Sequence, residues 1–234
     1  MRWFILALVL VGCGGKRFDI PSSSMLPTIE VGDKIATRAF EGVVQRGDVV
    51  VYVGRASTSP LYEGGPDKFF EGKDRVARVM ALPGERVRIE GEIVIVGGVP
   101  LTTTVEAERQ CEVYGMDFDR TPAGTCPCTV RREAGGGRSW LVQNFATTCG
   151  GGGTPDWPLA YRPPGTTRYL GAQAVNPDWP DVVVPQGHVL LLGDNRYRSE
   201  DSRFMGFTAI EDIHWIATEV VGNDAAPERA GLPL

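Results

Sequence analysis

The alternation of hydrophobic and polar positions predicts a chain built mainly of short β-strands. Residues 33–40 alternate between polar and apolar side chains, and residues 47–53 form an apolar, β-branched run. Each segment begins next to a Gly-Asp pair, which favours a turn. Further strands are predicted at 76–80 and 86–96, with the turn sequence LPGE between them. Consecutive short strands joined by turns are typical of an antiparallel β-meander.

The strand pattern is interrupted between residues 101 and 180. This stretch is rich in glycine and proline, and it shows sustained alternation only at 139–145. It is too long for one loop of a compact domain, and we therefore expect an inserted subdomain over 101–180. The pattern resumes in three predicted strands, which are residues 181–184, 188–193 and 213–221.

The predicted core is therefore split by the insertion into one part at 19–100 and another at 181–222. The polar, proline-containing tail at 223–234 is expected to be loose. The chain has 234 residues, 42% of them hydrophobic, which is enough for one such core with an insertion. The 30 glycines and 17 prolines fit a chain with many turns. We predict a mostly β fold.

The first 13 residues resemble an export signal. Arg2 is followed by an apolar run over 3–12 and then by Cys13. About ten helical residues extend roughly 15 Å, whereas a bilayer core of about 30 Å needs about twenty. The sequence LVGC at 10–13 resembles a lipobox, in which Cys13 would be diacylated and become the first residue. The alternatives are an uncleaved signal anchor and a start codon assigned too late.

The other cysteines lie inside the predicted insertion. An even number of cysteines in an exported chain favours disulfides, because the compartment outside the cytoplasm is oxidising. Cys126 and Cys128 are too close to bridge each other easily, so we expect them to pair with Cys111 and Cys149, in an order left open. No histidine lies near this cluster and its spacing is not a zinc pattern, so no metal site is predicted.

Two segments carry groups suited to chemistry. The sequence SSSMLPT at 22–28 places serines beside a proline, and a hydroxyl on such a rigid turn can act as a nucleophile. Serine-rich segments after a lipidated cysteine are also typical of flexible tethers. The sequence GDNRYRSEDSRFMG at 193–206 interleaves acids with arginines. This pattern indicates either a solvated loop or a loop held rigid by bidentate ion pairs.

In this order, four segments resemble the sequence boxes of the signal peptidase I family, peptidase family S26. The boxes are SxSMxPT at 22–28, GD at 47–51, RxxxLPG followed by an acid at 78–85, and GDNRxxSxDSRxxG at 193–206. The resemblance implies an antiparallel β-sheet fold with an inserted disulfide-containing subdomain. It also implies a serine endopeptidase at a membrane surface that uses a lysine general base and no cofactor.

The resemblance also implies a role for each matching residue. Ser24 resembles the nucleophile, Ser22 the hydroxyl donor of the oxyanion hole, and Met25 a wall of the substrate site. In the family a serine orients the lysine, an ion-pair network supports the site, and an arginine follows the lysine. The corresponding residues are Ser199 for the first, Asp194, Asp201 and Arg203 for the second, and Arg78 for the third.

The lysine position is occupied by Ala77. Lys73 is four residues upstream, about 13 Å away along a strand, and a single bulge cannot bring it into place. Neither His188 nor His214 occupies the position, and His188 reads as the start of a strand. Without a neighbouring base a serine hydroxyl is a poor nucleophile at neutral pH.

Two functions remain open on the sequence. The first is a signal peptidase I-like endopeptidase that cleaves signal peptides of exported proteins, and the second is an inactive lipoprotein that binds signal peptides or export intermediates. A structural envelope lipoprotein is a third possibility. The expected partners are signal peptides and the extracytoplasmic (periplasmic) membrane surface. A net charge of −5 provides no basic surplus for nucleic acid, which is excluded as a predicted partner.

Overall fold

The computed structural model describes residues 15–55, 71–90, 92–114, 120–146 and 182–234, apart from the side chain of residue 204. The predicted signal segment 1–13 with Cys13, and also Cys149, lie outside these residues. Within the described part, the chain forms three antiparallel sheets and three short helical turns. The predicted fold class, mostly β and antiparallel, is confirmed.

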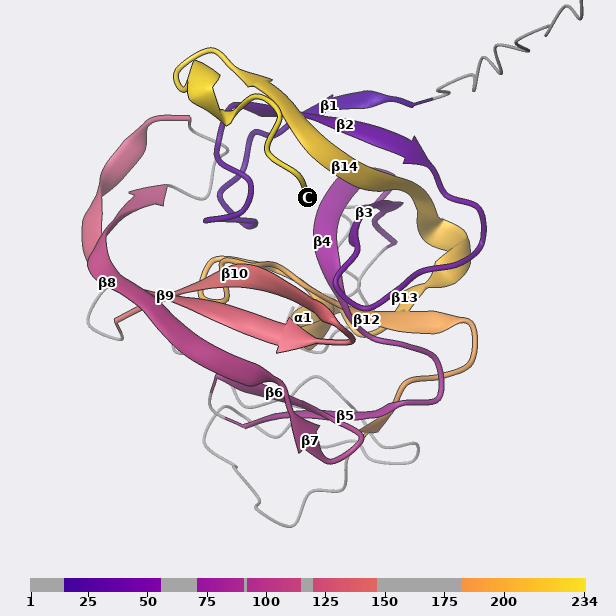
Figure 1. The fold of residues 1–234 in the computed structure, drawn as a ribbon. Helices are drawn as coiled ribbons and strands as arrows, with labels where there is room; N and C mark the ends of the chain where they lie inside the picture. The colour runs from indigo at the N-terminus through magenta and orange to yellow at the C-terminus, as the bar shows by residue number, and fades with distance from the viewer. Residues whose placement is uncertain (1–14, 56–70, 91, 115–119, 147–181) are drawn as a thin grey trace, which may run out of the picture.

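The largest sheet has seven strands in the order β1-β2-β14-β3-β4-β12-β13 (Figure 1). Its members are β1 (Arg17–Asp19), β2 (Asp33–Ala39), β3 (Val49–Val53), β4 (Asp74–Ala81), β12 (His188–Leu192), β13 (Thr208–Ala209) and β14 (Ile213–Asn223). The central strands β3 and β12 are almost continuously apolar, and the second half of β4 is buried, because both faces of these strands are covered. Strands from both predicted halves of the core therefore pair in one sheet.

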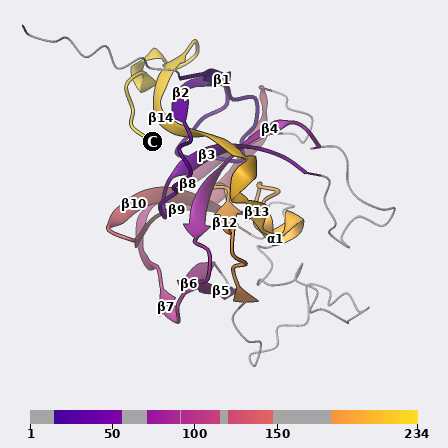
Figure 2. The ribbon, with the colours of Figure 1, turned by 90° about the vertical axis from the view of Figure 1, so that its right-hand side faces the viewer.

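Two smaller sheets complete the described fold. One has the order β11-β5-β6-β7, formed by β11 (Val182–Val183), β5 (Arg86–Glu90), β6 (Ile93–Val96) and β7 (Val99–Pro100). The other has the order β10-β9-β8, formed by β10 (Arg138–Phe145), β9 (Pro122–Gly135) and β8 (Thr102–Tyr114). Figure 2 shows β5, β6 and β7 at one end of the molecule and β1 and β2 at the other. The helical turns are α1 (Ser202–Met205), η2 (Ile210–Asp212) and η3 (Pro227–Arg229).

The prediction of a single strand at 86–96 is wrong, because this segment forms two strands, β5 and β6. Glu90 of β5 pairs with Ile93 of β6, so the chain reverses between them. The predicted loose tail is also wrong. The Arg229 guanidinium bonds both carboxylate oxygens of Asp33 at 2.7–3.1 Å, and the Leu234 N–H donates to the Thr218 carbonyl at 3.0 Å.

The region of the predicted insertion shares the main core. Trp140 and Val142 of β10 pack in one apolar cluster with Met80 of β4, Val94 of β6 and Leu190 of β12. The third sheet is thus held against the other two by buried side chains. The boundaries proposed for the insertion stay a prediction, since much of 101–180 lies outside the described residues.

One expected disulfide is present. Cys111 of β8 and Cys128 of β9 are bonded across the ribbon, with their Cα atoms 5.8 Å apart. Cys126 is also disulfide-bonded. The bonding of Cys149 stays a prediction.

Candidate active site

The serine segment is a compact turn anchored by apolar side chains. Met25 and Ile29 are buried in the cluster beneath it, and the Ile29 N–H donates to the Met25 carbonyl at 3.0 Å. The serine side chains remain half-exposed. The hydroxyls of Ser22 and Ser24 lie 3.3 Å apart, within hydrogen-bond distance. The turn therefore holds two hydroxyls side by side at the surface.

The segment that follows β12 holds the serine turn in place. The Asn195 N–H donates to the Ser24 carbonyl and the Asn195 side-chain amide donates to the Ser23 carbonyl, both at 3.0 Å. Gly193 lies between Ser24 and Ser199. A Cβ at this position would lie 2.6 Å from the Ser24 carbonyl oxygen and 2.2 Å from Ser199 Oγ. Both distances are too short for a carbon atom, so only glycine fits between these two serines.

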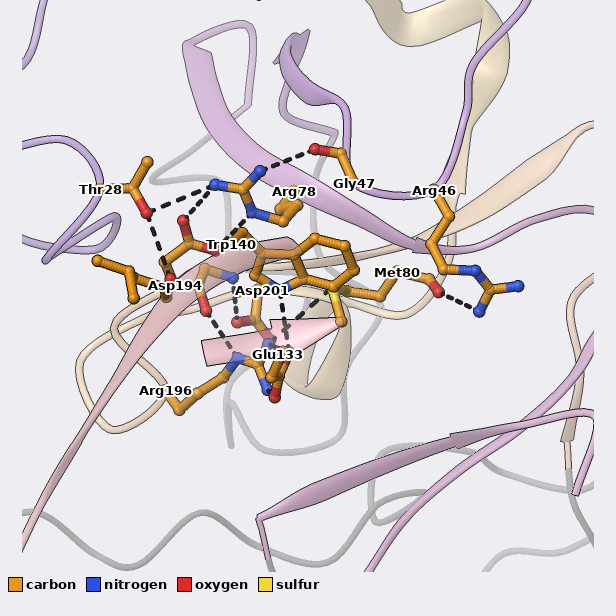
Figure 3. A network of polar contacts seen from close by, with 12 residues as sticks. Thr28, Arg46, Gly47, Arg78, Met80, Glu133, Trp140, Asp194, Arg196 and Asp201 are labelled. Carbon is orange, nitrogen blue, oxygen red and sulfur yellow. Dashed lines mark hydrogen bonds and ion pairs between the residues drawn. The ribbon is translucent and has the colours of Figure 1, made fainter. Parts of the chain in front are cut away.

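Arg78 and Asp194 form a buried, bidentate ion pair (Figure 3). Arg78 Nε and Nη2 donate to the two Asp194 oxygens at 2.8 and 2.6 Å, and Nη1 donates to the Gly47 carbonyl at 2.7 Å. The two residues are 3% and 0% exposed. The pair joins the middle of β4 to the loop that holds the serine turn.

Arg203 and Asp201 form a second buried pair. Arg203 Nε and Nη2 donate to the Asp201 carboxylate, both at 2.8 Å, and the Gly193 N–H donates to the same carboxylate at 2.9 Å. Burial alone would raise the pKa of Asp201, but the charge and hydrogen bonds of Arg203 outweigh it and hold the pKa below its ordinary value. Asp201 is therefore a carboxylate at neutral pH.

This depressed pKa predicts an acid-dependent loss of stability. A carboxyl group with a lowered folded-state pKa stabilises the fold above its unfolded value of 3.8, and this contribution disappears as the pH falls through the folded-state pKa. We expect the Asp201→Asn variant to lack this component, so that its stability deficit against wild type shrinks as the pH falls below about 5. Urea denaturation at several pH values measures it, and a deficit independent of pH would contradict the expectation.

A third buried pair was not expected from the sequence. Arg196 Nη1 and Nη2 donate to the two carboxylate oxygens of Glu133 on β9 at 2.8 and 2.6 Å, and Trp140 Nε1 donates to the same group at 3.0 Å (Figure 3). Burial would lower the pKa of Arg196, and the Glu133 carboxylate more than offsets this, so the pKa lies above its ordinary value. Arg196 belongs to a recognisable motif, whereas nothing in the sequence around Glu133 indicates its partner.

Ala77 lies in the middle of the large sheet. It is opposite Val50 of β3, and on its other side β4 pairs with β12 up to the pair of Arg78 with Leu192. Continuing that register by one residue places Gly193 beside Ala77. The Ala77 side chain is buried in an apolar cluster. The position expected to carry a lysine thus adjoins the glycine that separates Ser24 from Ser199.

Within the described residues, no lysine or histidine nitrogen is hydrogen-bonded to Ser24 Oγ, whose recorded partner is the Ser22 hydroxyl. Lys73 lies before the first residue of β4. His188 begins β12, as predicted, and His214 is exposed on β14. The structure therefore brings the predicted serines together with the acids and arginines but brings no described base to Ser24.

Two further features concern the described residues alone. No group of three or more histidine, cysteine, aspartate or glutamate residues there could hold a metal ion. Nor does any helix in those ranges combine the length and apolar character needed to cross a bilayer.

Fold and site together define a mostly β protein that presents paired serine hydroxyls on a turn held by buried ion pairs. The family model described as "Signal peptidase, peptidase S26" matches residues 1–221, and the chain belongs to this family. The predicted resemblance is confirmed.

Several curated signal peptidases are similar to this chain. Signal peptidase I of Pseudomonas aeruginosa is 26% identical over 217 residues, which cover 85% of this chain and 58% of that protein. The Haemophilus influenzae enzyme is 23% identical over 232 residues, covering 87% and 62%. This chain thus spans about three fifths of the length of these relatives. A signal peptidase I structure from Enterococcus faecalis matches with a TM-score of 0.32 and 19% identity, covering 73% of this chain and 93% of that one.

Proposed function

We propose that the site performs acyl transfer of the signal peptidase type, with Ser24 as the nucleophile. The observation that carries the proposal is the 3.3 Å approach of the Ser22 and Ser24 hydroxyls on a turn held by Asn195. Ser24 Oγ would attack the carbonyl carbon of the scissile peptide. The Ser22 hydroxyl and the Ser24 N–H would donate to the resulting oxyanion. The C–N bond of the scissile peptide would then break, the serine proton would reach the departing amine through water, and a second water would hydrolyse the acyl-enzyme. The substrates would be signal peptides of exported proteins.

The missing base sets the expected rate. Deleting one member of a catalytic serine unit costs about 10⁴- to 10⁶-fold in turnover, with the remainder supplied by the oxyanion hole and by substrate positioning. Because Ala77 supplies no base, the chain would hydrolyse peptides very slowly. The oxyanion donors and the substrate contacts do not depend on that base.

A specific observation favours a second function, the binding of signal peptides without cleavage. Residues 74–76 of β4 pair with β3 on one side, while the described pairing of β4 with β12 begins at Arg78. Among the described strands none pairs with the other edge of 74–76. An extended peptide could add to such an edge through main-chain hydrogen bonds.

One set of measurements separates these functions. A precursor with an Ala-x-Ala cleavage site is incubated with wild type and with Ser24→Ala, and a fluorescent signal peptide is titrated against both. We expect barely measurable cleavage that Ser24→Ala removes, and equal binding by both proteins. Rapid wild-type cleavage that depends on Ser24 would contradict the missing-base argument and make Lys73 the first candidate base to test. If the protein neither cleaves the precursor nor binds the signal peptide, the third function, a structural envelope lipoprotein, is favoured.

We also propose that the protein is anchored at the extracytoplasmic membrane surface by lipid on Cys13, which lies outside the described residues. The expected mature chain begins at Cys13 and carries acyl groups, whereas Cys13→Ala keeps its first 12 residues. Mass spectrometry of the purified N-terminus measures this. An intact Met1 without lipid would contradict it.

A further inference from the structure

A buried carboxylate on the third sheet contacts the loop behind the serine turn. Glu133 of β9 is 1% exposed and accepts hydrogen bonds from both terminal nitrogens of Arg196 and from Trp140 Nε1. A buried charge of this kind is tolerated only when it is paired and fully hydrogen-bonded. In sequence the position lies outside the four motifs of the family, 63 residues before Arg196, and it has no role in the reaction proposed above.

Glu133 is linked to Ser24 through three consecutive residues. Asp194 is paired with Arg78, and Arg196 is paired with Glu133, so both ends of the Asp194–Arg196 segment are fixed by buried ion pairs. Between them, Asn195 donates to the Ser23 and Ser24 carbonyls at 3.0 Å.

Strand β10 holds the same segment through its backbone. The Gln143 N–H donates to the Asp194 carbonyl at 2.8 Å, and the Arg196 N–H donates to the Gln143 carbonyl at 2.9 Å. The third sheet therefore contacts this segment by one side-chain pair and two main-chain hydrogen bonds.

We infer that Glu133 is a positioning residue for Ser24, acting through Arg196 and Asn195 to set where the serine turn lies. The inference rests on the proposed function only in taking Ser24 as the reacting group. The buried pair fixes the direction of the Arg196 side chain and hence the path of the backbone at Asn195. The two donors of Asn195 then determine the position of the carbonyls of Ser23 and Ser24, which lie on either side of the Ser24 Cα.

The Glu133→Gln substitution tests the charge with little change of shape. The amide has one acceptor oxygen in place of two, and its NH₂ group would face a guanidinium that also only donates. Arg196 would then remain buried without its direct ionic partner. We expect amide hydrogen exchange in 193–199 and in 22–28 to speed up by about tenfold or more, the range for a lost charge-assisted hydrogen bond. Exchange in β3 and β12 should stay unchanged.

The matched control is Glu106→Gln, which removes a carboxylate of the same sheet whose pair with Arg132 is exposed. It should leave all exchange rates as in wild type. If Glu133→Gln accelerates amide exchange equally throughout the protein, Glu133 has only a structural role and the inference is overturned. Unchanged exchange at 22–28 would also overturn it. If Glu133→Gln does not fold, the same comparison is made with Glu133→Asp, which keeps the charge on a shorter side chain and should give a smaller acceleration confined to these segments.

A second readout uses the Ala77→Lys background. There Glu133→Gln should lower kcat by about tenfold or more with KM unchanged, because it displaces the nucleophile and leaves the peptide-binding edge intact. A higher KM with unchanged kcat would overturn the inference. An Ala77→Lys protein without activity would count against the proposed function. The hydrogen-exchange measurement does not depend on turnover, so it would still decide the inference about Glu133.

Discussion

The Ala77→Lys variant should cleave a signal-peptide precursor on the order of 10⁴-fold faster than wild type, because it restores a base to a site that otherwise keeps its hydroxyls and ion pairs. A lysine serves as a base only when its pKa is lowered enough for it to be neutral. Ala77 is buried among apolar side chains, and Arg75 lies two residues away on the same face of β4, above the Tyr52 ring. Burial and a neighbouring cation both lower a lysine pKa.

The matching control is the Ala77→Lys/Ser24→Ala double variant, in which the new activity should disappear. Ala77→Met, of similar length without an amine, should also stay inactive. Initial rates on an Ala-x-Ala precursor measure all of these proteins. If the Ala77→Lys protein folds but does not cleave the precursor, the peptidase site is not otherwise intact, and the binding function is favoured.

Asp194→Asn should destabilise the protein by about 3–5 kcal/mol, which is the cost of removing one partner from a buried ion pair. The substitution leaves the Arg78 guanidinium buried, with the Gly47 carbonyl as a remaining acceptor. Chemical denaturation with matched slopes measures the free energy of unfolding.

Asp224→Asn is the control for this prediction, because the ion pair of Asp224 with Lys34 is largely exposed. Its free energy of unfolding should match that of wild type. An equally small effect of Asp194→Asn would show that solvent reaches Arg78 and that the pair is not buried in solution.

The strands of the large sheet could be predicted because burial leaves a clear pattern in their sequence. Strand β3 consists of four valines and one tyrosine, and the turn before β5 carries Pro83 and Gly84. The long ribbon of β8 and β9 could not be predicted in the same way. Most of β8 is exposed on both faces, so threonine, glutamate and arginine follow one another without alternation. Its pairing with β9 is visible only in three dimensions.

The candidate site was predictable only as far as its motifs extend. Interleaved acids and arginines at 193–206 indicated bidentate pairs, and Asp201 does pair with Arg203. The pairing of Arg196 with Glu133 was not predictable, because it joins positions 63 residues apart. Asn195 stood inside a motif, but its contact with the serine turn depends on the path of the backbone.

The wide spacing of the site along the chain has a consequence for when it forms. The bond of Asn195 to Ser23 spans 172 residues, and that of Arg78 to Asp194 spans 116. Contacts between such distant positions form late in folding, since the loop-closure entropy is lost before they are made. During synthesis, the serines therefore emerge long before the loop that orders them. A partly synthesised chain carries the two hydroxyls, but the site that holds them forms only when the last strands have paired.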